Sequence, residues 1–267
     1  MTSPYQPISP LRHAQRSWRR YTNYLWAATQ TVAPIVAPEV AHAALQFPIG
    51  FVDTGDKVIT VGVLGLEAGA NLFVGGDGRW LGGYIPAALR MRPFALLPTT
   101  DGKKVLCVDE VAGEVGEAVG APDTEPFFAP DGELAPAVRQ VMEFVSNIEN
   151  AKAPTEAAAA ALKQHGLLVP WAISIETDEG PRAVEGLLRA DEPALGRLGD
   201  EAFLELRHAN ALPLLYAHLL STQHLALLAQ LGRARAQAIR QQKVMPVTPS
   251  GELDLSFMNA GDTLRFS

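Results

Sequence analysis

The stretch that most constrains the fold is residues 71–94, which reads NLFVGGDGRWLGGYIPAALRMRPF. Its first apolar residues, 72–74, are strand formers, and the Gly-Gly-Asp-Gly run at 75–78 can supply the positive φ angles of a tight hairpin connection. Pro86 suits the first position of a short helix, and Pro93 would end that helix before another strand begins. This order of hairpin, helix and strand predicts a fold that mixes α and β elements.

The rest of the chain shows both periodicities. β-branched and apolar runs on either side of turn signals predict three strand pairs, at 49–52 with 58–64, at 94–97 with 104–108 and at 171–176 with 182–189. Apolar residues spaced three to four apart predict helices at 38–47, 134–148 and 213–240, the last with a possible break at Gly232. Capping residues predict two more, at 156–165, where Thr155 is the expected cap, and at 201–208. We therefore expect an α+β fold in which an antiparallel or mixed sheet is covered by helices and the C-terminal end is helical.

The domain boundary follows from where this periodicity stops. Residues 1–243 are expected to form a single domain, which is long enough to bury a substantial core. Residues 244–267 contain prolines and glycines without sustained periodicity and are expected to be a loosely held tail. Between the expected elements, residues 113–130 are rich in glycine, proline and acids and predict a surface loop.

Composition excludes several classes of protein. The chain is 48% hydrophobic and 19% charged, as in soluble globular proteins, and no apolar run reaches the length of a membrane span. Its net charge of -7 argues against a general nucleic-acid binder, which needs a basic field. The single cysteine, Cys107, lies in an apolar run and predicts a buried, unreactive thiol in a reducing cytoplasm.

Common catalytic motifs are missing from the sequence. There is no Gly-x-Ser-x-Gly elbow, no phosphate-binding loop, no dinucleotide fingerprint and no His-Glu-x-x-His pair. The six histidines show no metal-ligand spacing. We therefore expect no metal and no cofactor.

Aromatic and arginine side chains cluster in the central stretch, and five of them are candidates for binding a ligand: Arg79, Trp80, Tyr84, Arg90 and Arg92. Guanidinium groups bind carboxylate or phosphate, and indole and phenol rings stack on flat or apolar groups, so these residues could line a pocket for a small anionic or sugar-like ligand. Alternatively, the aromatics belong to the core and the arginines hold a loop in place.

Three further polar residues are candidates. Asp109 and Glu110 follow a buried strand, where paired carboxylates could exchange protons or bind a cation, or could form a solvated strand end with a salt bridge. His218 lies in a leucine-rich helix, where it is either a histidine of the core or part of a binding site.

Several short motifs in order resemble the SapC-like bacterial proteins, which take their name from a gene in a surface-layer protein locus. The resemblance covers most of residues 10–231 and rests on these pieces: Asn71-Leu72-Phe73-Val74, Asp77-Gly78-Arg79-Trp80, Tyr84-Ile85-Pro86-Ala87, Pro93-Phe94, Cys107-Val108-Asp109-Glu110 and Tyr216-Ala217-His218-Leu219. One departure is at residues 90–94, which read Arg-Met-Arg-Pro-Phe where such proteins usually read Arg-Arg-Tyr-Pro-Phe. The resemblance implies a connection with surface-layer export or outer-membrane uptake through gene context, and no particular reaction.

Two functions remain open at this point. The first is a cytoplasmic accessory or binding protein that serves cell-surface or outer-membrane uptake functions without catalysis, with an unknown protein partner or a small anionic or sugar-like ligand. The second is an enzyme that acts on such a ligand in the arginine and aromatic pocket, with Asp109, Glu110 or His218 as proton carrier. A pocket containing a polar dyad would favour the enzyme, and a flat apolar face with a basic rim would favour the binding protein.

Overall fold

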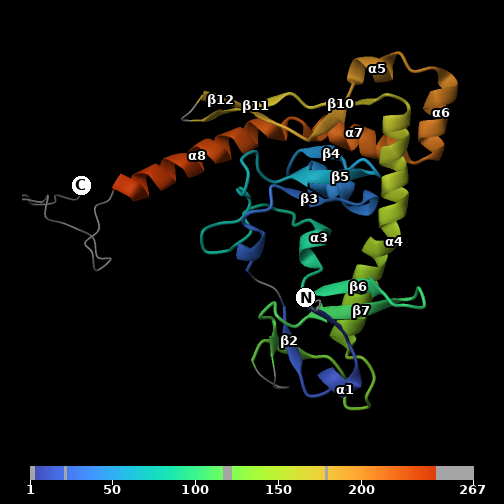
Figure 1. Ribbon diagram of the computed structural model, residues 1–267, viewed down its shortest axis with the longest axis vertical. Helices are drawn as coiled ribbons and strands as arrows, with labels where there is room; N and C mark the ends of the chain where they lie inside the picture. Colours follow the sequence, from blue (N-terminus) through green and yellow to red (C-terminus); the bar gives the residue numbers. More distant parts are fainter. Residues whose placement is uncertain (1–3, 21–22, 117–121, 178–179, 245–267) are drawn as a thin grey trace, which may run out of the picture.

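A computed structural model describes residues 4–20, 23–116, 122–177 and 180–244 of the chain. The fold is α+β, as the sequence predicts, and its C-terminal region is helical (Figure 1). The strands are β1 (Tyr5–Pro7), β2 (Ser17–Arg19), β3 (Val32–Pro34), β4 (Ile49–Asp53), β5 (Val58–Val63), β6 (Phe94–Pro98), β7 (Lys104–Asp109), β8 (Val115–Gly116), β9 (Thr124–Pro126), β10 (Leu168–Pro170), β11 (Ile173–Thr177), β12 (Gly180–Val184) and β13 (Leu188–Ala190). The α-helices are α1 (Pro10–His13), α2 (Val40–Ala44), α3 (Ala87–Arg90), α4 (Pro136–Gln164), α5 (Glu192–Gly196), α6 (Asp200–His208), α7 (Ala211–Ser221) and α8 (His224–Val244), and the 3-10 helices are η1 (Leu25–Ala27) and η2 (Ala37–Glu39).

All strand pairings among the described residues are antiparallel. The largest sheet has the order β10-β13-β4-β5-β3, and smaller sheets have the orders β1-β7-β6, β8-β2-β9 and β11-β12. Each of the three strand pairs expected from turn signals includes a hairpin: β4 with β5, β6 with β7, and β11 with β12. These hairpins were predictable because β-branched residues flank a short turn that can form locally.

Helix α4 joins the two ends of the molecule (Figure 1). The sequence predicts two helices here, separated near Pro154, but the structure has one helix from Pro136 to Gln164 with Pro154 inside it. Pro154 is exposed, so the carbonyl left without its usual N–H partner faces water. Thr155 is not a helix cap as expected; its hydroxyl donates to the Ala151 carbonyl oxygen (2.7 Å) and accepts from the Ala37 N–H (2.8 Å).

Two main hydrophobic clusters lie along α4. The larger one is formed by the five-stranded sheet, α2, α7 and the C-terminal half of α4, and includes Phe47, Phe51, Leu162 and Leu215. The second is formed by β2, β6, β7 and the N-terminal half of α4, with members including Trp18, Phe94, Val108, Phe127 and Val138. Burying large apolar side chains on both sides of one helix holds the two ends of the molecule together.

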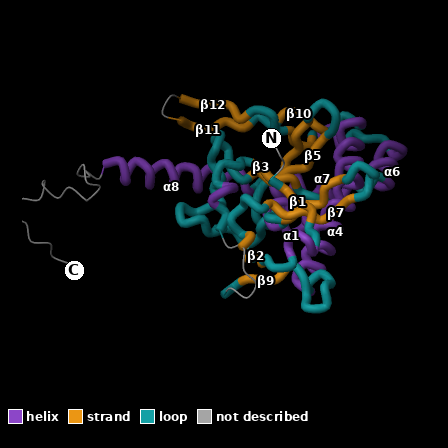
Figure 2. Tube along the Cα trace, turned by 60° about the horizontal axis from the view of Figure 1, so that its bottom comes forward, coloured by secondary structure: helices purple, strands orange, loops and turns teal. Residues whose placement is uncertain are grey.

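The C-terminal helix differs from the expected continuous one. Residues 213–240 were predicted to form a single helix with a possible break at Gly232, but the break is at Thr222 and Gln223, between α7 and α8. The Ser221 and Thr222 hydroxyls donate to the carbonyls of His218 and Leu219, both at 2.7 Å, and so occupy acceptors that the next helical turn would use. Beyond this break α8 first packs on the fold, where Leu228 is buried and the Arg235 Nη1 donates to the Asn71 carbonyl oxygen at 2.8 Å, and its C-terminal end projects from the rest of the fold in both views (Figures 1 and 2). The expected tail at 244–267 lies outside the described residues apart from Val244, the last residue of α8.

The hairpin expected at residues 72–81 is reduced to one β-bridge, between Val74 and Trp80. Its tight turn is present, since the Gly75 N–H donates to the Arg79 carbonyl oxygen at 2.9 Å and Gly78 has a φ of 84°. A Cβ at Gly78 would also collide with the Asn23 carboxamide, so this position requires glycine. None of the helices in the described part of the chain is long and apolar enough to cross a membrane.

Candidate functional site

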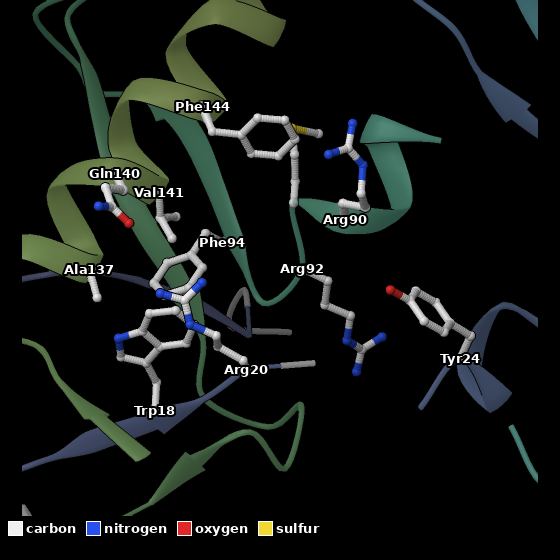
Figure 3. Close-up of a pocket in the computed structure, with 11 residues that line it drawn as sticks. Trp18, Arg20, Tyr24, Arg90, Arg92, Phe94, Ala137, Gln140, Val141 and Phe144 are labelled. Atoms are coloured by element: carbon white, nitrogen blue, oxygen red, sulfur yellow. The ribbon is translucent and has the colours of Figure 1, made fainter. Parts of the chain in front are cut away.

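A cavity of about 320 Å³ lies beside the second hydrophobic cluster, where β2, the α3–β6 connection and the first turns of α4 meet (Figure 3). The cavity is lined by Trp18, Arg20, Tyr24, Arg90, Met91, Arg92, Phe94, Ala137, Gln140, Val141 and Phe144. This volume is within the range of small-molecule sites. No carboxylate is present among the described residues that line it.

Three separate parts of the chain build this cavity, and each has a local reason for its position. Strand β2 pairs with both β8 and β9, which places Trp18 against Phe94 with ring centroids 4.8 Å apart. The short helix α3 ends at Arg90, so the chain turns into β6 with Arg92 between them. On α4 the lining residues are Ala137, Gln140, Val141 and Phe144, whose spacing of three or four puts them on one face.

The guanidinium groups of three lining arginines each lie over an aromatic ring. Arg92 lies 4.7 Å from the Trp26 ring centroid, Arg90 lies 5.0 Å from that of Phe144, and Arg20 lies 5.9 Å from that of Trp18. Such cation–π contacts use the face of the guanidinium and leave the N–H groups at its edge for hydrogen bonds. The arginines are therefore held in position largely by rings. Arg20 also lies 3.6 Å from the Glu125 carboxylate, and Arg92 is close enough to the Glu114 carboxylate to lower its pKa, against the larger effect of burial, which raises it.

Arg90, although exposed, is fixed further by a chain of hydrogen bonds that leads to a buried carboxylate. Its Nε donates to the Ile85 carbonyl oxygen at 3.0 Å and its Nη2 to the Tyr84 hydroxyl at 3.2 Å. The Tyr84 hydroxyl in turn donates to the buried Glu39 carboxylate at 2.7 Å. Burial, together with the hydrogen bond to Glu39, raises the pKa of Tyr84 to about 12. Tyr84 therefore holds Arg90 and does not line the cavity.

Two donors in the cavity wall have no hydrogen-bond partner. These are the Nε of Arg92 and the indole Nε1 of Trp18, both buried and both unpaired within the described part of the chain. A buried polar group without a partner costs about 1–3 kcal/mol, so such groups are uncommon in folded proteins. Both belong to residues that line the cavity.

The lining has no group that titrates near neutral pH. Arginines stay charged, and burial raises the pKa of the Tyr24 phenol above its usual value of 10.0. The cavity is consequently cationic and aromatic over the physiological range.

The structure brings only two of the eight predicted site residues, Arg90 and Arg92, into this cavity. Trp80 packs elsewhere: its ring stacks on Phe73 at 5.6 Å, and its Nε1 donates to the Tyr84 carbonyl oxygen at 2.9 Å. Arg79 is exposed on the adjacent turn. The two residues point in different directions, as alternation along a strand predicts.

Asp109 and Glu110 lie at the end of β7 and do not line the cavity, although the Asp109 N–H donates to the Pro93 carbonyl oxygen at 2.8 Å, beside the lining residues Arg92 and Phe94. The Glu110 carboxylate accepts from Arg12 at 2.6 Å and 2.7 Å and from Arg16 at 2.6 Å, and the buried His13 ring lies 3.1 Å away. The hydrogen bond from Arg12 is the largest cause that lowers the pKa of Glu110 to about 2. Glu110 thus fastens the segment before β2 to the end of β7.

His218, on α7, is fully buried against the first residue of β4 and the last residue of β13. Its Nε2 accepts from the Ala190 N–H at 3.0 Å, and its Nδ1 lies 2.7 Å from the Ile49 carbonyl oxygen, so Nδ1 carries the proton. Burial is the main cause that lowers the pKa of His218 to about 4. The neutral ring joins α7 to β4 and β13 with both nitrogens occupied. It also borders a second cavity, of about 560 Å³, with Trp171, Arg189 and Glu192.

Sequence reasoning missed the contributions of β2 and α4 to the cavity. Trp18, Arg20 and Tyr24 lie in a segment that offers no clear periodicity, and Phe144 falls on the apolar face of a predicted helix. One usable signal is the run of arginines with aromatics at residues 16–24, which repeats the composition of residues 79–94. In the described residues no group of three or more histidine, cysteine, aspartate and glutamate side chains could hold a metal ion.

Comparison with known proteins places the cavity within the part of the chain that matches a protein family. The family model described as SapC matches residues 8–228, which include β2, the α3–β6 connection and α4, and therefore every residue that lines the cavity. No match was found among curated proteins, and none among solved structures. Since the matched region is most of the 267 residues, the chain belongs to the SapC family.

Proposed function

We propose that this protein binds a small anionic ligand in the cavity between β2, α3 and α4, and that it does so without catalysing a reaction. The observation that carries the proposal is the pair of unpartnered donors, Arg92 Nε and Trp18 Nε1, in the wall of a cavity with three arginines. A carboxylate, phosphate or sulfonate would supply the missing acceptors and balance the charge.

The rival function, an enzyme with the same pocket, has less support. Asp109, Glu110 and His218 were its expected proton carriers, and none of them lines the cavity. Glu110 is engaged by two arginines and both nitrogens of His218 are hydrogen-bonded. A general acid or base needs to reach the ligand with a pKa near the working pH, which no described lining residue offers.

The test is calorimetric titration with 2-naphthyl phosphate and with 2-naphthol, which has the same ring without the charge. We expect the phosphate to bind more tightly, and Arg20→Gln and Arg92→Gln each to weaken its binding by about 1.5–3 kcal/mol, the usual loss of a hydrogen bond to a charged group. Arg79→Gln is the matched control, because Arg79 is exposed outside the cavity. Equal affinity for the two compounds, or an equal effect of all three substitutions, would contradict the proposal.

We also propose that the protein acts in the cytoplasm in support of cell-surface or outer-membrane uptake functions, with a protein partner still to be identified. Membership of the SapC family supports this role through the gene context of such proteins. The unpaired, buried Cys107, whose pKa is raised by burial, suits a reducing compartment. Cell fractionation tests the location: we expect full-length protein in the cytoplasm, and a shortened form of the protein in the periplasm would refute it.

A further inference from the structure

The cavity wall is rich in hydrogen-bond donors and poor in acceptors. Its donors come from three guanidinium groups and the indole Nε1 of Trp18. Among the described lining side chains, oxygen acceptors are confined to the Gln140 carboxamide and the Tyr24 hydroxyl. A ligand that fits must therefore bring acceptors and few donors of its own.

The other side chains that line the cavity are mainly apolar and lie on one side of it. Val141 and Phe144 project from one face of α4, and Phe94 and Trp18 close the wall below them (Figure 3). Met91 completes this side from the end of α3. The guanidinium groups of Arg20 and Arg92 thus line the same cavity as these apolar and aromatic side chains, among which Gln140 is polar.

We infer that the ligand is an anion with an apolar body, such as an aromatic or aliphatic carboxylate, phosphate or sulfonate, and not a sugar or sugar phosphate. This inference rests on the proposed function and adds the class of ligand. Each sugar hydroxyl is a donor that loses its water on binding, and Val141, Phe144 and Phe94 offer it no acceptor; of the lining residues on α4, Gln140 alone can accept. An apolar body loses no hydrogen bond there and gains from burial.

The experiment compares two ligands with the same head group. The protein is titrated with 2-naphthyl phosphate and with glucose 6-phosphate, and we expect the naphthyl compound to bind on the order of tenfold or more tightly, the ratio that burying one apolar ring gives. If neither compound binds, both the proposed function and this inference fail. If glucose 6-phosphate binds as well or better, the anion site stands and the inference about the ligand body is overturned.

A pair of variants on α4 locates the apolar wall. Val141→Asn places an amide in the wall, and Met142→Asn makes the same change at the next position, which is 38% exposed and outside the lining. We expect Val141→Asn to weaken 2-naphthyl phosphate binding severalfold while glucose 6-phosphate binding is unchanged, and Met142→Asn to leave both unchanged. If the two variants behave alike, with thermal unfolding showing both folded, the naphthyl group does not lie on α4 and the inference is refuted.

Discussion

The buried imidazole of His218 makes a quantitative prediction about acid stability. The ring bonds to Ala190 and Ile49 in its neutral form, and the Phe51 and Trp171 rings lie 5.2 Å and 5.4 Å from it. Protonating Nε2 would turn the acceptor for the Ala190 N–H into a second donor. The hydrogen bond would be lost and a charge would be left in the core.

The direction and size of the resulting change in stability follow from the pKa of His218. Burial lowers the folded-state pKa of His218 to about 4 from its ordinary 6.5, so the unfolded chain takes up this proton at a higher pH than the folded chain does. The stabilisation is therefore complete above about pH 6.5 and is lost as the pH falls toward 4. Since one pKa unit corresponds to 1.36 kcal/mol, the loss amounts to about 3 kcal/mol at pH 4.

The assay is urea unfolding at pH 7, 6, 5 and 4 for the wild type and for His218→Gln. Glutamine can accept from Ala190 and donate to Ile49 but does not titrate, so we expect the stability difference between the two proteins to shrink by about 3 kcal/mol between pH 7 and pH 4. His13 is also buried with a lowered pKa, and taking the difference between the two proteins removes its contribution. His208→Gln, at an exposed position of α6, is the control and should follow the wild type. If His218→Gln keeps the full pH dependence of the wild type, the assignment of a neutral bridging histidine is wrong.

Three other outcomes are expected. Trp80→Ala should lower the free energy of unfolding by about 3 kcal/mol, because the Trp80 ring is half-buried against Phe73, whereas Arg79→Ala should change it by less than about 0.5 kcal/mol. If denaturant unfolding shows the larger loss for Arg79→Ala, then Arg79 and not Trp80 is the residue that packs. Glu110→Gln should be less stable than the wild type above about pH 4.5, because the cationic partners of Glu110 lower its carboxyl pKa to about 2, and the wild type should lose this advantage as the pH falls from 4.5 toward 2. Unfolding curves that coincide for the two proteins at pH 5 would contradict this. Deleting residues 245–267 should leave the thermal unfolding midpoint almost unchanged, since prolines and glycines interrupt any apolar period there, and a loss of more than about 2 kcal/mol would indicate a docked segment.

Local sequence patterns predicted the elements that form by local rules. Runs of β-branched residues on either side of a turn signal predicted the hairpins β4–β5 and β6–β7, and apolar residues spaced three to four apart predicted the helical conformation of α4. The prediction of two helices separated near Pro154 was wrong, because proline locally favours the end of a helix. Packing of both halves of α4 in the two hydrophobic clusters, together with the exposed position of Pro154, outweighed that preference.

The sequence by itself determined the class of fold, the family and the excess of arginine and aromatic side chains in the central stretch. Only the tertiary structure decided which of these side chains meet. Arg92 and Phe144 line the same cavity as Trp18, although the three residues are far apart in the chain. Trp80 packs half-buried against the core, whereas Arg79 is exposed to solvent. Contacts over such separations depend on how strands pair and helices pack across the whole fold, and no local pattern of residues encodes that arrangement.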